Sequence, residues 1–138
     1  IESITSALPN AICYSQITDN DELDSPILIL DTIGQLANAY SYGNMAYIGG
    51  GFSGSLHNIL EPAVFGLPVI FGPKHTRFPE AQNFIDCGIG RAVNSTAEFQ
   101  IAFTKINENL AVLSQKTAEF IEQNKGASDK IILKITAN

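Results

Sequence analysis

Positively charged residues are scarce in this sequence. Its 138 residues include eight Lys and Arg against fourteen Asp and Glu, which gives a formal net charge of -6 at pH 7. The basic residues are scattered, and no two of them are adjacent. Binding to the phosphate backbone of nucleic acids depends on clustered Lys and Arg side chains. The composition therefore argues against a nucleic-acid partner.

Cysteine is also scarce, and no metal-binding pattern is present. Cys13 and Cys87 stand 74 positions apart in apolar surroundings, without CxxC spacing. We expect two reduced, buried thiols of the kind found in cytosolic proteins. His57 and His75 have neither HExxH spacing nor a cysteine partner, so the sequence predicts no metal site.

Several other signatures are missing. No stretch approaches the roughly 18 apolar residues of a membrane helix, and there is no signal-peptide pattern. The GK[ST] and GxSxG motifs are absent, which argues against a Walker ATPase and a serine hydrolase. The chain opens on IESITSALPN without an initiator Met, so we expect a fragment of a longer protein.

Short apolar runs alternate with helical patterns along the chain. Strands are expected at residues 11–15, 26–31, 45–49, 68–72 and 90–94. Helices are expected at residues 1–8, 33–43, 56–66, 78–88 and 95–126, with a capping arrangement at 95–98 and a break near 107–109, before a last amphipathic segment at 128–138. This alternation predicts a parallel sheet with helices on both faces, that is, one α/β domain with a Rossmann-like three-layer sandwich over residues 1–138.

Three loops that follow expected strands carry unusual residues. They are the DTIG loop (residues 31–34), the glycine loop (residues 49–58) and the lysine–arginine loop (residues 72–78). Ligands of open parallel sheets bind outside the carboxyl ends of the strands, and all three loops should emerge there. We therefore expect a binding site at this edge.

The glycine loop has two explanations. Gly49, Gly50 and Gly51 allow backbone amides to approach an anion closely, or they only make a tight turn and a close packing contact. At the entry of the next helix, Asn58 and His57 either cap the helix or face a ligand. Glu61 either serves the first turn of that helix or, as we favour, binds a ribose or sugar diol. Lys74, His75 and Arg77 are either solvated or neutralise a phosphate or carboxylate.

Residues 26–93 carry a resemblance to a known family. The motifs DTIGQL, AYIGGGF and HNILEPAVFGLPVIFGP resemble the carboxy-terminal, donor-binding domain of 3-deoxy-D-manno-octulosonic acid (Kdo) transferases. Members of this family are two-domain GT-B glycosyltransferases that transfer Kdo from CMP-Kdo to a lipid A precursor. Two departures are present: Gln35 replaces an acidic residue of many members, and Ser55-Leu56 replaces glycines before His57.

The resemblance implies roles for particular residues. Thr32, Ile33 and Gly34 would lie near the CMP moiety, and the backbone of Gly49, Gly50 and Gly51 would lie close to the donor. Asn58 and Glu61 would hold the ribose or the Kdo sugar. From its place in the lysine–arginine loop, we expect Lys74 to bind the donor as well. No metal ion or other cofactor is implied.

The resemblance also implies what this chain would lack. The catalytic base, the acceptor site and the membrane-associating segment of the family belong to the amino-terminal domain. The full enzyme would act at the cytoplasmic face of the bacterial inner membrane, whereas this chain would be soluble, would bind donor and would not turn over.

Alternative functions are open at this stage. One is another GT-B glycosyltransferase or a UDP-sugar epimerase with a similar Glu-Pro helix. Another, from a different class, is a non-catalytic nucleotide-binding module.

Overall fold

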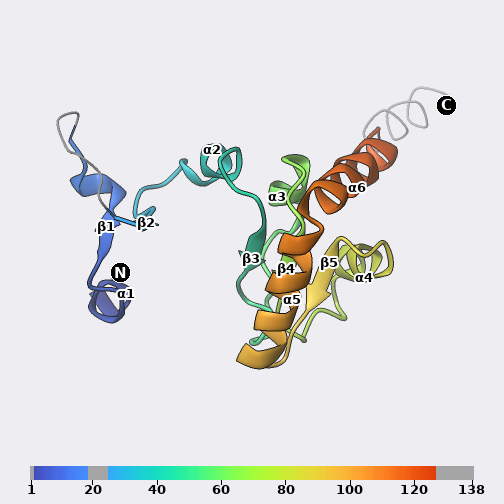
Figure 1. Ribbon diagram of the computed structural model, residues 1–138, viewed down its shortest axis with the longest axis horizontal. Coiled ribbons are helices and arrows are strands. Elements are labelled where there is room, and N and C mark those ends of the chain that lie inside the picture. The colour runs from blue at the N-terminus through green and yellow to red at the C-terminus, as the bar shows by residue number, and fades with distance from the viewer. Residues whose placement is uncertain (1, 19–24, 127–138) are drawn as a thin grey trace, which may run out of the picture. The chain divides into compact units, whose positions relative to one another are not determined.

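The computed structural model of the protein describes residues 2–18 and 25–126 (Figure 1). These residues group into two units, Ile1–Ala39 and Tyr40–Asn138, and each is described by itself. That residues 1–138 form one domain stays a prediction. The expected amphipathic segment at residues 128–138 lies outside the described residues.

The first unit contains a pair of parallel strands. Its elements are α1 (Glu2–Ala7), β1 (Ala11–Cys13), a 3-10 helix (Tyr14–Gln16) and β2 (Ile27–Ile29). In the register of this pair, Ala11 lies opposite Ile27 and Cys13 opposite Ile29. Helix α2 (Leu36–Tyr40) begins in this unit and ends at the first residue of the second.

The second unit contains a three-stranded parallel sheet in the order β3-β4-β5 (Figure 1). Its elements are β3 (Ala46–Ile48), α3 (Leu60–Val64), β4 (Val69–Phe71), α4 (Pro79–Asp86), β5 (Gly90–Ala92), α5 (Thr96–Glu108) and α6 (Leu110–Asn124). Each expected strand and helix of this unit is present, with shorter bounds than the apolar runs indicated. The strands alternate with helices, as parallel pairing requires.

Side chains of the central strand β4 enter two different cores. Val69 and Phe71 pack in a cluster with residues of α3 and α4, among them Ala63 and Phe84. Ile70 packs in a second cluster with residues of α5 and α6, such as Ile106. Because successive side chains of a strand point to opposite faces, the two clusters lie on opposite sides of the sheet. The unit is therefore a three-layer sandwich, as the sequence predicted, and Figure 1 shows α5 lying across β4.

The start of α5 and the junction to α6 follow the sequence signals. The Ser95 hydroxyl accepts a hydrogen bond from the Glu98 amide at 3.2 Å, and the Glu98 carboxylate accepts one from the Asn94 amide at 2.8 Å. This reciprocal arrangement satisfies amides that a helix start leaves unpaired. Helix α5 ends at Glu108 and α6 begins at Leu110. The predicted cap and the predicted break near residues 107–109 are both confirmed.

The two cysteines differ in exposure. Both are free thiols, and Cys13 is buried, but Cys87 is exposed. The expectation that Cys87 is buried is wrong because this residue is the C-cap of α4, where Gly88 turns the chain with a φ of 75°. Its side chain therefore stands at the end of the helix and not on the buried face that Ala81 and Phe84 form.

Among the described residues, no helix combines the length and the apolar character needed to cross a bilayer.

We predict that Gly51→Ala destabilises the protein. An added Cβ at Gly51 would lie 2.5 Å from the backbone nitrogen and 2.7 Å from the Cα of Gly72, so one of the two loops must shift. The expected loss is about 1–3 kcal/mol in the free energy of unfolding, measured by urea denaturation.

Gly49→Ala is the matched control for this substitution. A Cβ at Gly49 would lie 3.7 Å from the His57 ring, which is ordinary van der Waals contact. Its free energy of unfolding should change by at most about 1 kcal/mol in either direction. Equal losses for the two variants would contradict the packing argument.

Candidate functional site

The glycine loop and the lysine–arginine loop meet at the carboxyl edge of the β3-β4-β5 sheet. The carbonyl of Gly51 accepts a hydrogen bond from the Lys74 amide at 2.8 Å. The backbones of Gly51 and Gly72 approach so closely that neither position has room for a Cβ. The predicted meeting of these two loops is confirmed. The DTIG loop belongs to the other unit, so its place at the same edge stays a prediction.

The glycine loop folds around the carbonyl of Gly50. This carbonyl accepts hydrogen bonds from the amides of Ser53, Gly54 and Ser55 at 3.0–3.1 Å. Gly50 has a φ of 82°, and a Cβ there would lie 1.9 Å from the Ser55 carbonyl oxygen. Such a conformation favours glycine strongly. The tight-turn explanation of the glycines therefore holds for Gly50, and the packing explanation holds for Gly51.

The amides of Gly50 and Gly51 leave the anion-binding explanation open as well. Within residues 2–18 and 25–126, no hydrogen-bond acceptor is found for either of them. Unpaired amides of successive residues in a tight turn can bind an anion. The loop thus combines a required turn with two amides for which no protein acceptor is found.

Asn58 connects the start of α3 to Glu61. Its side-chain oxygen accepts a hydrogen bond from the Leu60 amide at 3.0 Å, and its side-chain nitrogen donates to Glu61 Oε1, also at 3.0 Å. Both side chains are exposed, whereas Pro62 and Ala63 are buried in the core beneath them. The capping explanation of Asn58 is correct, and the same side chain also orients the carboxylate of Glu61.

His57 packs against the glycine loop. Its backbone amide donates to the carbonyl of Gly49 at 3.1 Å. Its ring lies beside Gly49 and Gly50, 3.1 Å from where a Cβ of Gly50 would stand. The ring therefore occupies the space that these glycines leave, which gives His57 a packing role in the loop.

Tyr40 lies near Glu61, a neighbour that the sequence reasoning did not identify. The rings of Tyr40 and Phe65 are 6.1 Å apart. Burial raises the pKa of the Tyr40 phenol, and the negative charge of Glu61 raises it further. The phenol is therefore protonated at neutral pH. In the sequence, Tyr40 lies in the helix expected at residues 33–43, on one apolar face with Leu36 and Ala37, and this pattern predicts no functional role.

A polar pocket lies between the two loops of the sheet edge. Its volume is about 420 Å³, and its lining residues are Ser53, Gly54, Pro73, Lys74, Thr76 and Arg77. Both cations of the lysine–arginine loop thus reach one pocket. His75 does not line it, because its ring packs edge-on against Phe71 with centroids 5.4 Å apart.

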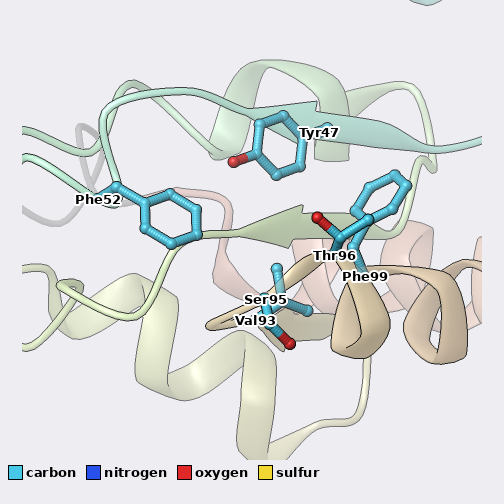
Figure 2. Close-up of a pocket in the computed structure, with 6 residues that line it drawn as sticks. All are labelled: Tyr47, Phe52, Val93, Ser95, Thr96 and Phe99. Carbon is cyan, nitrogen blue, oxygen red and sulfur yellow. The ribbon is translucent and has the colours of Figure 1, made fainter.

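A second pocket of about 400 Å³, the aromatic pocket, lies on the α5 side. Its lining residues are Tyr47, Phe52, Val93, Ser95, Thr96 and Phe99. Figure 2 shows the rings of Tyr47, Phe52 and Phe99 around this space, and the first and last of these meet edge to face at 5.7 Å. The sequence reasoning missed this pocket; the one available signal was Phe52, a large apolar residue in a Gly- and Ser-rich loop.

The DTIG loop is anchored by its first residue. The Asp31 carboxylate accepts hydrogen bonds from the amide of Ser15, at 2.9 Å, and from the Ser15 hydroxyl. These bonds lower the pKa of Asp31. Thr32, Ile33 and Gly34 are exposed, and Gly34 has a φ of 91°. The three residues predicted to lie near a nucleotide are thus accessible on an anchored loop.

Metal-ligating side chains are dispersed. In the part of the chain that the structure describes, no group of three or more His, Cys, Asp or Glu could hold a metal ion.

Curated proteins of similar sequence are named 3-deoxy-D-manno-octulosonic acid transferase. The chain is 32% identical to that of Chlamydophila psittaci over 108 residues, which is 75% of this chain and 25% of the relative. It is 32% identical to that of Aquifex aeolicus over 109 residues, which is 77% of this chain and 30% of the relative. The chain therefore spans between a quarter and a third of the length of these relatives. No family model matches the chain.

A solved structure has a similar fold. The crystal structure of the C-terminal CMP-Kdo binding domain of WaaA from Acinetobacter baumannii matches with a TM-score of 0.69 and 21% sequence identity. The match covers 87% of this chain and 65% of that one. The predicted fold class, the carboxy-terminal half of a GT-B fold, is confirmed by this likeness.

We predict that the stabilising contribution of Asp31 is lost in acid. Its pKa is lower in the folded protein than the ordinary value of 3.8, so its contribution is present above that value and disappears as the pH falls below it. Asp31→Asn should lower the unfolding temperature more at pH 7 than at pH 3.

Thermal unfolding followed by circular dichroism at the two pH values measures this effect. Ser15→Ala should act in the same direction and more weakly, because the Ser15 amide still donates to the carboxylate. If Asp31→Asn lowered the unfolding temperature by the same amount at pH 3 and at pH 7, the stabilising role of the ionised Asp31 carboxylate would be refuted.

Proposed function

The chain is a relative of the Kdo transferases, which are glycosyltransferases, and on that premise we propose that it is their donor-binding domain, with CMP-Kdo as the donor. The observation that carries the proposal is the meeting of three groups at one sheet edge. They are the unpaired amides of Gly50 and Gly51, the Asn58–Glu61 pair at the start of α3, and the Lys74 side chain. These are the donors and the acceptor that a sugar phosphate requires.

We assign the residues of the sheet edge, and those of the DTIG loop in the other unit, to different parts of the donor. The amides of Gly49, Gly50 and Gly51 and the Lys74 ammonium group face the phosphate. Glu61, held by Asn58, accepts hydrogen bonds from a diol of the ribose or of Kdo. Thr32, Ile33 and Gly34 bind the nucleotide. When the bond between the Kdo anomeric carbon and the phosphate oxygen breaks, CMP leaves as an anion, and donors placed around its phosphate stabilise that charge.

The remaining parts of the reaction belong to the longer enzyme. We assign the catalytic base, the lipid A precursor and the membrane contact to an amino-terminal domain. This places the whole enzyme in lipopolysaccharide biosynthesis, at the cytoplasmic face of the bacterial inner membrane. The chain by itself is expected to be soluble, to bind donor without a metal ion and to have no transferase activity.

Calorimetric titration with CMP and UDP tests the proposal. We predict that the 138-residue chain binds CMP and binds UDP at least about tenfold more weakly, a difference of about 1.4 kcal/mol. A preference for UDP would favour another GT-B enzyme or a UDP-sugar epimerase. Tight binding of CMP with no transfer activity in any longer form of the protein would favour a non-catalytic module.

We predict that Glu61→Ala weakens CMP-Kdo binding by about 10- to 100-fold, because a hydrogen bond to a charged group contributes about 1.5–3 kcal/mol. Stability should change little, since Glu61 is exposed. Calorimetry and thermal unfolding measure the two effects. In the longer enzyme the same substitution should abolish Kdo transfer.

Glu119→Ala is the matched control for Glu61→Ala. Glu119 is an exposed residue of α6 whose carboxylate accepts a hydrogen bond from the Gln115 side-chain amide at 2.8 Å, so its local interaction imitates the Asn58–Glu61 pair. This control should bind CMP-Kdo like the unmodified chain. Near-normal binding or transfer by Glu61→Ala would contradict the role assigned to Glu61.

A further inference from the structure

We propose that the polar pocket binds the carboxylate of an acidic sugar, with Arg77 and Thr76 as its donors, separately from the phosphate contacts of the glycine loop. The proposal rests on the proposed function, because it concerns the sugar end of the same donor. It gives Arg77 a role that neither the motifs nor the comparisons assign.

The charges of the pocket are the first argument. Lys74 and Arg77 are two of only eight basic residues in an acidic chain, yet both line the same pocket. Among the described residues, the ion pair that is formed is Lys125–Glu122, at the far end of α6. Neither Lys74 nor Arg77 has an acidic partner within the described residues. Two unpaired cations in one concave space favour an anionic ligand.

The anchoring of the loop is the second argument. The Lys74 amide is bound to Gly51, the His75 amide donates to the Pro73 carbonyl at 3.0 Å, and the Phe78 amide donates to the His75 carbonyl at 2.8 Å. The His75 ring packs against Phe71 of the central strand. The segment that carries Thr76 and Arg77 is therefore held at both ends, which reduces the entropy lost when it binds a ligand.

The chemistry of the donors is the third argument. A guanidinium group presents a planar fork that matches the two oxygens of a carboxylate, whereas an ammonium group acts as a point charge. The Thr76 hydroxyl can donate, and it has no partner in the described parts of the chain. The Ser53 hydroxyl already donates to the Gly50 carbonyl at 2.9 Å. Arg77 and Thr76 are thus the pocket's free donors for a carboxylate, and Lys74 remains available to the phosphate.

The size and position of the pocket are the fourth argument. A volume of about 420 Å³ lies in the range of small-molecule sites, roughly 300–1,000 Å³. Its wall includes Ser53 and Gly54, which are separated in the chain from the unpaired Gly50 and Gly51 amides by Phe52 alone. The aromatic pocket is lined by no charged residue and offers an anion no compensation. An acidic sugar joined to a phosphate at the glycine loop would therefore place its carboxylate in the polar pocket.

Calorimetric titration of CMP and CMP-Kdo into the 138-residue chain tests this inference. The chain should bind CMP-Kdo more tightly than CMP. Arg77→Gln should remove that gain, weakening CMP-Kdo binding about tenfold or more while leaving CMP binding unchanged. Arg77→Lys, which keeps the charge and loses the fork, should retain part of the gain. Thr76→Val should also lose part of it.

Arg91→Gln is the matched control, because it removes the same group from β5, where the Arg91 guanidinium donates to the Gly90 carbonyl. It should bind both ligands normally, and circular dichroism checks that each variant is folded. Three results would overturn this inference and leave the proposed function standing. Arg77→Gln could lose CMP and CMP-Kdo affinity equally, or it could lose neither. The unmodified chain could also bind CMP-Kdo no more tightly than CMP. If the unmodified chain binds neither ligand, the proposed function fails with it.

Discussion

The contact between Gly51 and Gly72 determines how the glycine loop and the lysine–arginine loop meet. These two backbones pack directly against each other. The Gly51 carbonyl also accepts a hydrogen bond from the amide of Lys74, two residues after Gly72. One loop carries the unpaired amides and the other carries the cations, so their separation is fixed by this contact. A side chain at either glycine would force the loops apart. The relative position of the groups proposed to bind an anion therefore depends on two residues that have no side chain.

The polar pocket and the aromatic pocket have opposite chemistry. The polar pocket has Lys74 and Arg77, whereas the aromatic pocket has three rings and three hydroxyl groups, one of them the phenol of Tyr47. Desolvating a phosphate or carboxylate without a compensating charge or donor is costly. The anionic group of a ligand is therefore favoured in the polar pocket over the aromatic pocket, whatever the rest of that ligand contacts.

Much of the second unit follows from the sequence, because local signals and the hydrophobic pattern agree there. The apolar run at Val69–Phe71 predicts a strand buried on both faces, and Ser95 with Glu98 predicts the start of α5. The exposure of Cys87 was not predictable from apolar neighbours, since it depends on where α4 ends. The aromatic pocket combines residues nearly fifty positions apart, such as Tyr47 and Thr96, and no local pattern relates them. Likewise, Asn58 was expected to cap the helix or face a ligand, and only the side-chain geometry shows that it caps and also orients Glu61.

At most positions of the candidate site, the side chain proposed to bind the ligand contributes little to the stability of the fold. Asn58, Glu61, Lys74 and Arg77 are exposed, and the buried residues next to them, such as Pro62 and Phe71, form the core. Substituting an exposed side chain removes little packing, so these positions can change with the ligand while the fold persists. Gly50 and Gly51 are different, because their amides are proposed to bind the donor while their missing side chains permit the loop to close. If the proposed donor contacts are right, binding and folding impose the same requirement at these two glycines, and variation should be least tolerated there.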